Sequence, residues 1–227
     1  MYWQENNNKD VAMSDEVQDL VYKIRCTSLP VDHAFALSEE IISLLPWMAS
    51  ETGAGIHSIH VADSGNGWMR PENPDALLHL SRRTKLILRV PKNRLESAIS
   101  LVDATLDVAG NKMTIESVEQ RPLSKITTLF CRYLVFSELP EPENVFLDKA
   151  MKALQEIEII PKKLLPGLEK TIQKPGKMIK TRSLMIAGIS AEESFKLQQK
   201  GLGMHHHLGC GIFIPHKDIE EIGHTPE

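Results

Sequence analysis

The strongest constraint on the fold is the order of apolar patterns along the chain, because one order occurs twice. The first half begins with the alternation typical of a strand, followed by apolar residues at helical spacing, with Asp32 as the expected N-cap. Two more strands, a second helix and a hairpin that turns at residues 109–111 complete this half. Its elements are predicted at residues 16–26, 33–48, 55–62, 84–90, 92–102 and 104–117.

The second half repeats this order with different residues. Its last helix carries a capping box, Ser190 followed by Glu193. Strand, helix, strand, strand, helix, strand is the order of a ferredoxin-like unit, so we predict an α+β protein with tandem ferredoxin-like (RRM-like) domains. Its elements are predicted at residues 125–137, 142–157, 162–172, 177–189, 190–200 and 209–215. The domains are predicted at residues 15–120 and 121–216, between a flexible leader at 1–14 and a tail at 217–227.

Composition narrows the class of protein. Of the 227 residues, 42% are hydrophobic and 25% charged, which is typical of a soluble globular chain. No apolar stretch approaches the roughly 20 residues of a membrane helix, and the polar start does not resemble a secretion signal. We therefore expect a cytoplasmic protein that does not contact membranes. The three cysteines are far apart in sequence, which predicts reduced thiols without a metal site, and no cofactor is expected.

The net charge of −4 hides a segregation of charge. Residues 82–94 include six basic side chains and no acid, and residues 162–182 include seven basic side chains and one acid, Glu169. Such runs predict a groove for a polyanion, although solvated basic faces are the alternative interpretation. The basic residues expected to contact that polyanion are Arg82, Arg83, Lys177, Lys180 and Arg182.

The segment "GLGMHHHLGCG", residues 201–211, joins the last predicted helix to the last predicted strand. A dinucleotide-binding glycine motif would follow a strand and open a helix, and a P-loop would continue with Gly-Lys-Ser/Thr, so neither fits. A metal site made from its histidines and Cys210 remains an alternative. Four glycines exceed the need of one turn, so we expect something large to approach this backbone closely.

The chain also resembles a known family. Tandem ferredoxin-like units with a Gly-x-Gly, five residues, Gly-x-Gly loop resemble the repeat-associated (RAMP) RNA-binding superfamily of CRISPR systems. The segments "RCTSLPVDHAFAL", "GAGIHSIH", "SAEESFKLQQKGLG" and "GCGIFIP" are similar to its repeat-processing endoribonuclease, the sixth Cas family, in the variety found with Myxococcus-type loci. The resemblance covers most of residues 16–215. One departure is the run of histidines where relatives often carry Lys or Arg.

The resemblance implies metal-independent cutting of precursor CRISPR RNA within each repeat, leaving a 5′-hydroxyl and a 2′,3′-cyclic phosphate. Histidine suits this chemistry, because its pKa of about 6.5 allows it to take and supply protons near neutral pH. In the family the acid or base commonly lies in the first helix or just after it, so His57 is the first candidate and His33 the second. The further residues expected to hold RNA are Lys200, Gly201, Gly203, His205, His206, His207, Gly209 and Gly211.

The expected partner is CRISPR repeat RNA, as a short stem-loop, with subunits of a CRISPR effector complex as further candidates. We expect a monomer or a homodimer. Two alternatives stay open from sequence: a subunit that binds CRISPR RNA without cutting it, and an unrelated enzyme that binds a small ligand at the histidine run.

Overall fold

The computed structural model of the chain describes residues 16–60, 73 and 76–216. The predicted leader and tail, and the end of the strand predicted at 55–62, lie outside the described residues. Across the part that is described, no helix is long and apolar enough to cross a membrane.

The first half forms a five-stranded antiparallel sheet in the order β3-β5-β1-β7-β6. Apart from the added edge strand β6, this is the strand order of a ferredoxin-like unit, so the predicted fold class is confirmed. The strands are β1 (Val17–Arg25), β3 (Gly55–Ile56), β5 (Lys85–Pro91), β6 (Thr105–Val108) and β7 (Asn111–Arg121). The helices are α1 (Ala34–Leu44) and α2 (Leu95–Ile99), with short 3₁₀ turns at Pro46–Ala49 and Lys92–Arg94.

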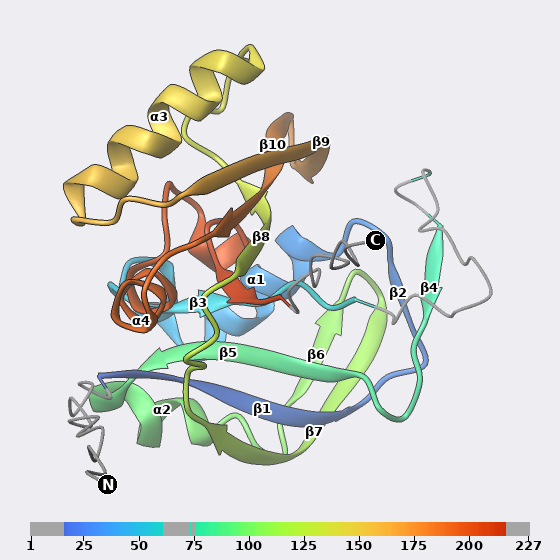
Figure 1. Cartoon of the computed structure of the whole chain (residues 1–227). Helices are drawn as coiled ribbons and strands as arrows, with labels where there is room; N and C mark the ends of the chain where they lie inside the picture. The colour runs from blue at the N-terminus through green and yellow to red at the C-terminus, as the bar shows by residue number, and fades with distance from the viewer. Residues whose placement is uncertain (1–15, 61–72, 74–75, 217–227) are drawn as a thin grey trace, which may run out of the picture.

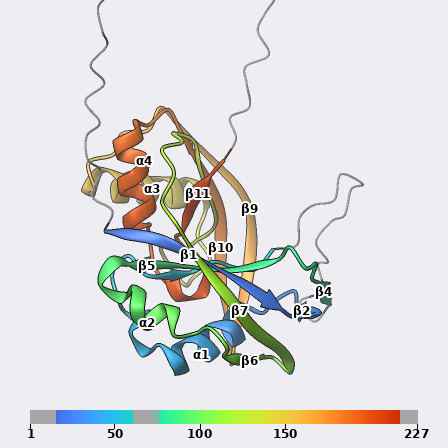
Figure 2. The same cartoon turned by 90° about the horizontal axis from the view of Figure 1, so that it is seen from below.

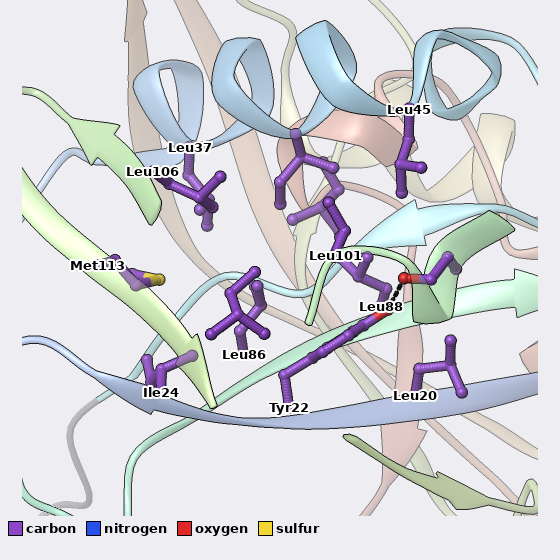
Figure 3. Close-up of a cluster of buried hydrophobic side chains, with 14 of the residues drawn as sticks. Leu20, Tyr22, Ile24, Leu37, Leu45, Leu86, Leu88, Leu101, Leu106 and Met113 are labelled. Atoms are coloured by element: carbon purple, nitrogen blue, oxygen red, sulfur yellow. Dashed lines mark hydrogen bonds between the residues drawn. The ribbon is translucent and has the colours of Figure 1, made fainter. Parts of the chain in front are cut away.

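One face of this sheet forms the main hydrophobic core. Leu20, Tyr22 and Ile24 alternate along β1 and point towards α1 and α2 (Figure 3). The Tyr22 hydroxyl donates to the Ala98 carbonyl oxygen of α2 at 2.8 Å, so the buried phenol keeps a hydrogen-bond partner. Both helices lie on this side, and most of the second half of the chain lies on the other (Figure 2), while residues 163–174 and 206–208 of the second half also contact α1. The helix-free face of the sheet is therefore turned towards the second half.

The second half forms a four-stranded antiparallel sheet in the order β11-β8-β10-β9, again the ferredoxin-like order. Helices α3 and α4 pack together on one face of it (Figure 1). The predicted capping box is present, because Ser190 Oγ accepts the Glu193 N–H and the Glu193 carboxylate accepts the Ser190 N–H. The elements are β8 (Leu129–Leu134), α3 (Glu143–Glu156), β9 (Lys163–Lys174), β10 (Lys177–Ala187), α4 (Ala191–Lys200), a 3₁₀ turn (His206–Leu208) and β11 (Phe213–Pro215).

The structure departs from the predicted elements at the N-cap of α1 and at three short segments. The N-cap is His33 rather than Asp32, whose carboxylate accepts the Gln173 N–H of the second half instead. A two-stranded ribbon of β2 (Ser28–Pro30) and β4 (Leu77–His79) was not predicted, because three residues are too few to show alternation. Only Gly55 and Ile56 of the strand predicted at 55–62 pair as a strand among the described residues. The last strand begins at Phe213 rather than 209, because positive φ angles at Gly209 and Gly211 interrupt extended backbone.

Candidate active site

A cleft of about 620 Å³ lies between the two sheets. The helix-free face of the first sheet contributes Asp19 and Lys85, and the second sheet contributes Arg132 and Ile214. The segment that joins the two sheets borders it from residue 122 to residue 126. The cleft is thus formed by segments from both halves of the chain.

The cleft is basic. Its described lining includes Arg83, Lys85, Arg121 and Arg132, whereas Asp19 is the one acidic side chain in that lining. Such an excess of positive charge attracts a polyanion and makes its binding sensitive to salt. Arg83 was expected from sequence to contact RNA, and it does line the cleft, whereas its neighbour Arg82 is exposed outside it.

His57 lines the cleft and comes directly after β3. The backbone N–H of His57 donates to the Ile87 carbonyl oxygen at 2.9 Å, which fixes this part of the main chain against β5. Its Nε2 lies 3.4 Å from Oδ1 of Asp19, and its side chain is 11% exposed. The imidazole therefore lies beside a carboxylate while it still lines the cleft.

Asp19 and His57 lie among opposing charges that set their protonation. Burial alone would raise the pKa of Asp19, but Arg89 and His57 beside it prevail and hold the pKa well below its usual range. Burial lowers the pKa of His57, and the opposing effect of Asp19 does not restore it. His57 is therefore neutral at neutral pH, which is the form that accepts a proton.

His33, the second candidate, lies away from the cleft lining and is 2% exposed. Its Nδ1 lies 2.9 Å from the Pro30 carbonyl oxygen, and its Nε2 accepts the Ile59 N–H at 3.2 Å. A neutral ring satisfies both contacts, with the proton on Nδ1. His33 thus fixes the segment that carries His57, and its placement favours this supporting role over a chemical one.

The glycine-rich segment 201–211 packs against the protein itself. Gly201, Gly203, Gly209 and Gly211 all have positive φ, as does His205. A Cβ at Gly203 would lie 2.2 Å from the Val135 carbonyl oxygen, and one at Gly211 would lie 2.1 Å from that of Leu202. The expectation that a large partner approaches this backbone is not needed to explain the glycines, because the protein's own main chain occupies that space.

The three consecutive histidines point in different directions. His205 Nε2 lies 2.9 Å from Oε1 of Glu138, and His206 Nε2 lies 3.3 Å from the Leu202 carbonyl oxygen. None of the three lines the cleft, although Gly209 of the same segment does. Within the described residues, no group of three or more His, Cys, Asp or Glu side chains is arranged to hold a metal ion, so the alternative metal site with Cys210 finds no support there.

The basic residues predicted on β10 pair with acids outside the cleft. Lys177 contacts Glu138, and Lys180 Nζ lies 3.0 Å from Glu169 Oε1. Arg182 Nη1 lies 2.9 Å from Glu143 Oε2 of α3, and its guanidinium lies over the Phe146 ring. A role of these residues in RNA binding stays a prediction, as it does for exposed Lys200 at the end of α4.

Comparison with known proteins assigns the chain to a family. The sequence model described as "Cas6 Crispr" matches residues 18–218, which is most of the chain. The chain belongs to the Cas6 family. A curated relative, the CRISPR-associated endonuclease Cas6 of Myxococcus xanthus, is 28% identical over 197 residues, covering 87% of this chain and 80% of the relative.

Solved Cas6 structures share the fold. A CRISPR-associated protein Cas6 superposes with a TM-score of 0.60 at 12% identity, covering 89% of this chain and all of that one. A Cas6-related protein from Pyrococcus furiosus superposes with a TM-score of 0.61 at 14% identity, covering 90% of this chain and 99% of that one. The tandem ferredoxin-like arrangement predicted from sequence is the one these Cas6 structures have.

Several residues of this Cas6 cleft were missed by sequence reasoning. Asp19, Arg121 and Arg132 each stand outside the basic runs, so local composition gave no signal. Register does provide one, because Asp19 is the direct cross-strand neighbour of Arg89 on one side and of Arg121 on the other. His60 and Tyr133 also line the cleft, with their rings stacked at 6.1 Å.

Three partly buried histidines predict a loss of stability in mild acid. Burial lowers the pKa of His57, His206 and His207 below the value of about 6.5 expected in the unfolded chain. Below that pH the unfolded state binds protons that the folded state does not, so the free energy of unfolding falls as pH decreases towards the folded-state pKa. Urea unfolding at pH 7.5 and 5.5 measures this, and equal free energies would contradict it. Carboxylates with a lowered pKa change the free energy of unfolding only at pH values below this range.

Proposed function

We propose that this Cas6 chain is an endoribonuclease that binds CRISPR repeat RNA in the cleft and cuts it without a metal ion. The observation that carries the proposal is that His57, a neutral imidazole, lines a cleft together with four cationic side chains. The endonuclease name of the Myxococcus relative supports the same activity. The RNA partner is proposed to be a short stem-loop, and the cut RNA would pass to CRISPR effector subunits.

The chemistry needs little more than these groups. In RNA the 2′-oxygen already lies beside the scissile phosphorus, so alignment and removal of its proton are the main requirements. His57 takes that proton, the 2′-oxygen bonds to phosphorus, and the bond to the 5′-oxygen breaks. The leaving 5′-oxygen takes up a proton. The proposed donor is His60, the second imidazole in the described cleft lining. The products are a 2′,3′-cyclic phosphate and a 5′-hydroxyl, while the cleft cations stabilise the negative charge of the transition state.

The test is incubation of the purified protein with the repeat RNA of its own locus in excess EDTA. The expected result is one cut with a cyclic phosphate end. A matched RNA with a single 2′-deoxy nucleotide before the cut should stay intact, because it lacks the nucleophile. Tight binding without any cut would instead identify a non-catalytic CRISPR RNA binder, and failure to bind would overturn the RNA function altogether.

Replacement of Arg132 by alanine tests the location of the RNA. Arg132 lines the cleft, so its loss should weaken repeat RNA binding and reduce the slope of log K against log salt by roughly 0.7 to 0.9. Lys149→Ala on α3, which pairs with Glu141 outside the cleft, is the control and should leave the slope unchanged. Filter binding at salt concentrations from about 50 to about 300 mM measures both slopes.

The same titration examines the residues that sequence singled out on β10. If RNA occupies only the cleft, Lys180→Ala and Arg182→Ala leave affinity and slope unchanged. A reduced slope in either variant would instead extend the RNA path to the hairpin of β9 and β10.

A further inference from the structure

Asp19 is buried at the centre of a charged cluster that spans three segments of the first sheet. It is 5% exposed, on the helix-free face of β1. Its Oδ1 lies 3.0 Å from Arg89 Nε of β5 and 3.4 Å from His57 Nε2, and its Oδ2 lies 3.2 Å from Arg121 Nη2 of β7. Two of these neighbours are permanently charged, so Asp19 is ionised whatever the state of His57.

Arg89 connects this cluster to the second half of the chain. It is 3% exposed, and its Nη1 donates to the carbonyl oxygen of Gln198 at 2.8 Å and to that of Phe213 at 2.9 Å. Gln198 belongs to α4 and Phe213 to β11. The guanidinium that holds Asp19 is thus itself fixed by the docked second sheet.

We propose that Asp19 is a positioning residue for His57: it keeps the imidazole proton on Nε2 and leaves Nδ1 as the nitrogen that acts on RNA. The proposal rests on the proposed function for the role of His57, but the pairing itself does not. A carboxylate beside one ring nitrogen selects the tautomer with hydrogen on that nitrogen and restrains the ring. Through Arg89, this arrangement requires the second half to be docked.

The tautomer is measured in RNA-free protein by NMR with ¹⁵N-labelled histidine, using His57→Ala to assign the signal. In the wild type we expect His57 at pH 8 with hydrogen on Nε2. Hydrogen on Nδ1 would overturn the proposal. This measurement needs neither cleavage nor an Asp19 variant, so it decides the pairing even if the protein proves to be a non-catalytic binder or Asp19→Asn fails to fold.

Asp19→Asn tests the consequence for the reaction. The single-turnover cleavage rate is expected to fall on the order of 10-fold or more, because the ring loses its preferred tautomer. Among the described residues, the charged groups that face His57 are Asp19, Arg89 and Arg121, so removal of the one anion among these three lowers the pKa of the imidazole. The acidic limb of the pH–rate profile should therefore move to lower pH, while the Kd for repeat RNA stays within about threefold, since all four cationic side chains of the cleft lining are kept.

A purely structural role gives a different pattern. A folded Asp19→Asn protein whose rate falls while the pH–rate profile stays in place would overturn the proposal. Loss of folded protein would lower the rate and the RNA-binding capacity together, and the tautomer measurement on the wild type then decides. Glu116→Gln is the matched control, because it removes one acid from β7 that pairs with Lys23 rather than with His57. It should leave both the tautomer and the profile unchanged.

Discussion

Replacement of His57 by alanine is expected to lower the single-turnover cleavage rate by about 10²- to 10⁴-fold, the usual contribution of a general base. RNA affinity should change little, because the cationic side chains of the cleft remain. The fold should also persist, since Asp19 keeps its contacts with Arg89 and Arg121 when the imidazole is gone. The rate is measured with excess protein over repeat RNA in EDTA, and affinity by filter binding.

His79→Ala is the matched control for this variant. His79 is an exposed histidine on β4 outside the cleft lining, so its loss should leave the rate unchanged. Cleavage by His57→Ala at the wild-type rate would remove His57 from the chemistry. In that outcome His60→Ala becomes the informative variant, because His60 is the other imidazole that lines the cleft.

Gly211→Ala should give the largest loss of stability, about 3 kcal/mol or more in the free energy of unfolding. The residue has φ of +67°, and a Cβ there would lie 2.1 Å from the Leu202 carbonyl oxygen. Its N–H also donates to the Tyr133 carbonyl oxygen at 2.7 Å, so the backbone cannot move without losing contact with β8. Urea unfolding followed by circular dichroism measures the loss.

Gly110→Ala separates the two causes of this effect. Gly110 has φ of +79° in the hairpin between β6 and β7, but no atom lies within 4 Å of the position of an added Cβ. The positive φ alone should cost about 1 kcal/mol there. If Gly110→Ala and Gly211→Ala cost the same, the close packing of the segment against the main chain would be refuted as its cause.

Sequence patterns predicted the fold well because both ferredoxin-like units depend on local signals. Strand alternation over 16–26 and the capping box at Ser190 are readable without knowledge of neighbours. The β2–β4 ribbon was missed because its two short strands become recognisable only once they pair. Long, regular elements were thus predictable, and short elements stabilised by tertiary contacts were not.

The site was less predictable, because charges that are close in sequence are not the charges that are close in space. The basic residues of β10 form a prominent run, yet Lys180 and Arg182 pair with acids that are distant in sequence. Asp19, in contrast, looks like an ordinary solvent-facing strand residue until the pairing of β1 with β5 and β7 surrounds it with arginines. His57 could be proposed from resemblance, but its partner could be found only from register.

The contacts of Arg89 across the cleft bear on how far sequences with this fold can diverge. Its acceptors in the second half are two main-chain carbonyl oxygens, which every amino acid supplies. Substitutions at Gln198 and Phe213 preserve these two hydrogen bonds as long as the path of the backbone is kept. The contacts of Arg89 therefore depend on the position of the main chain in the second half and not on its side chains. Side chains can change in either half while the relative orientation of the two halves is retained.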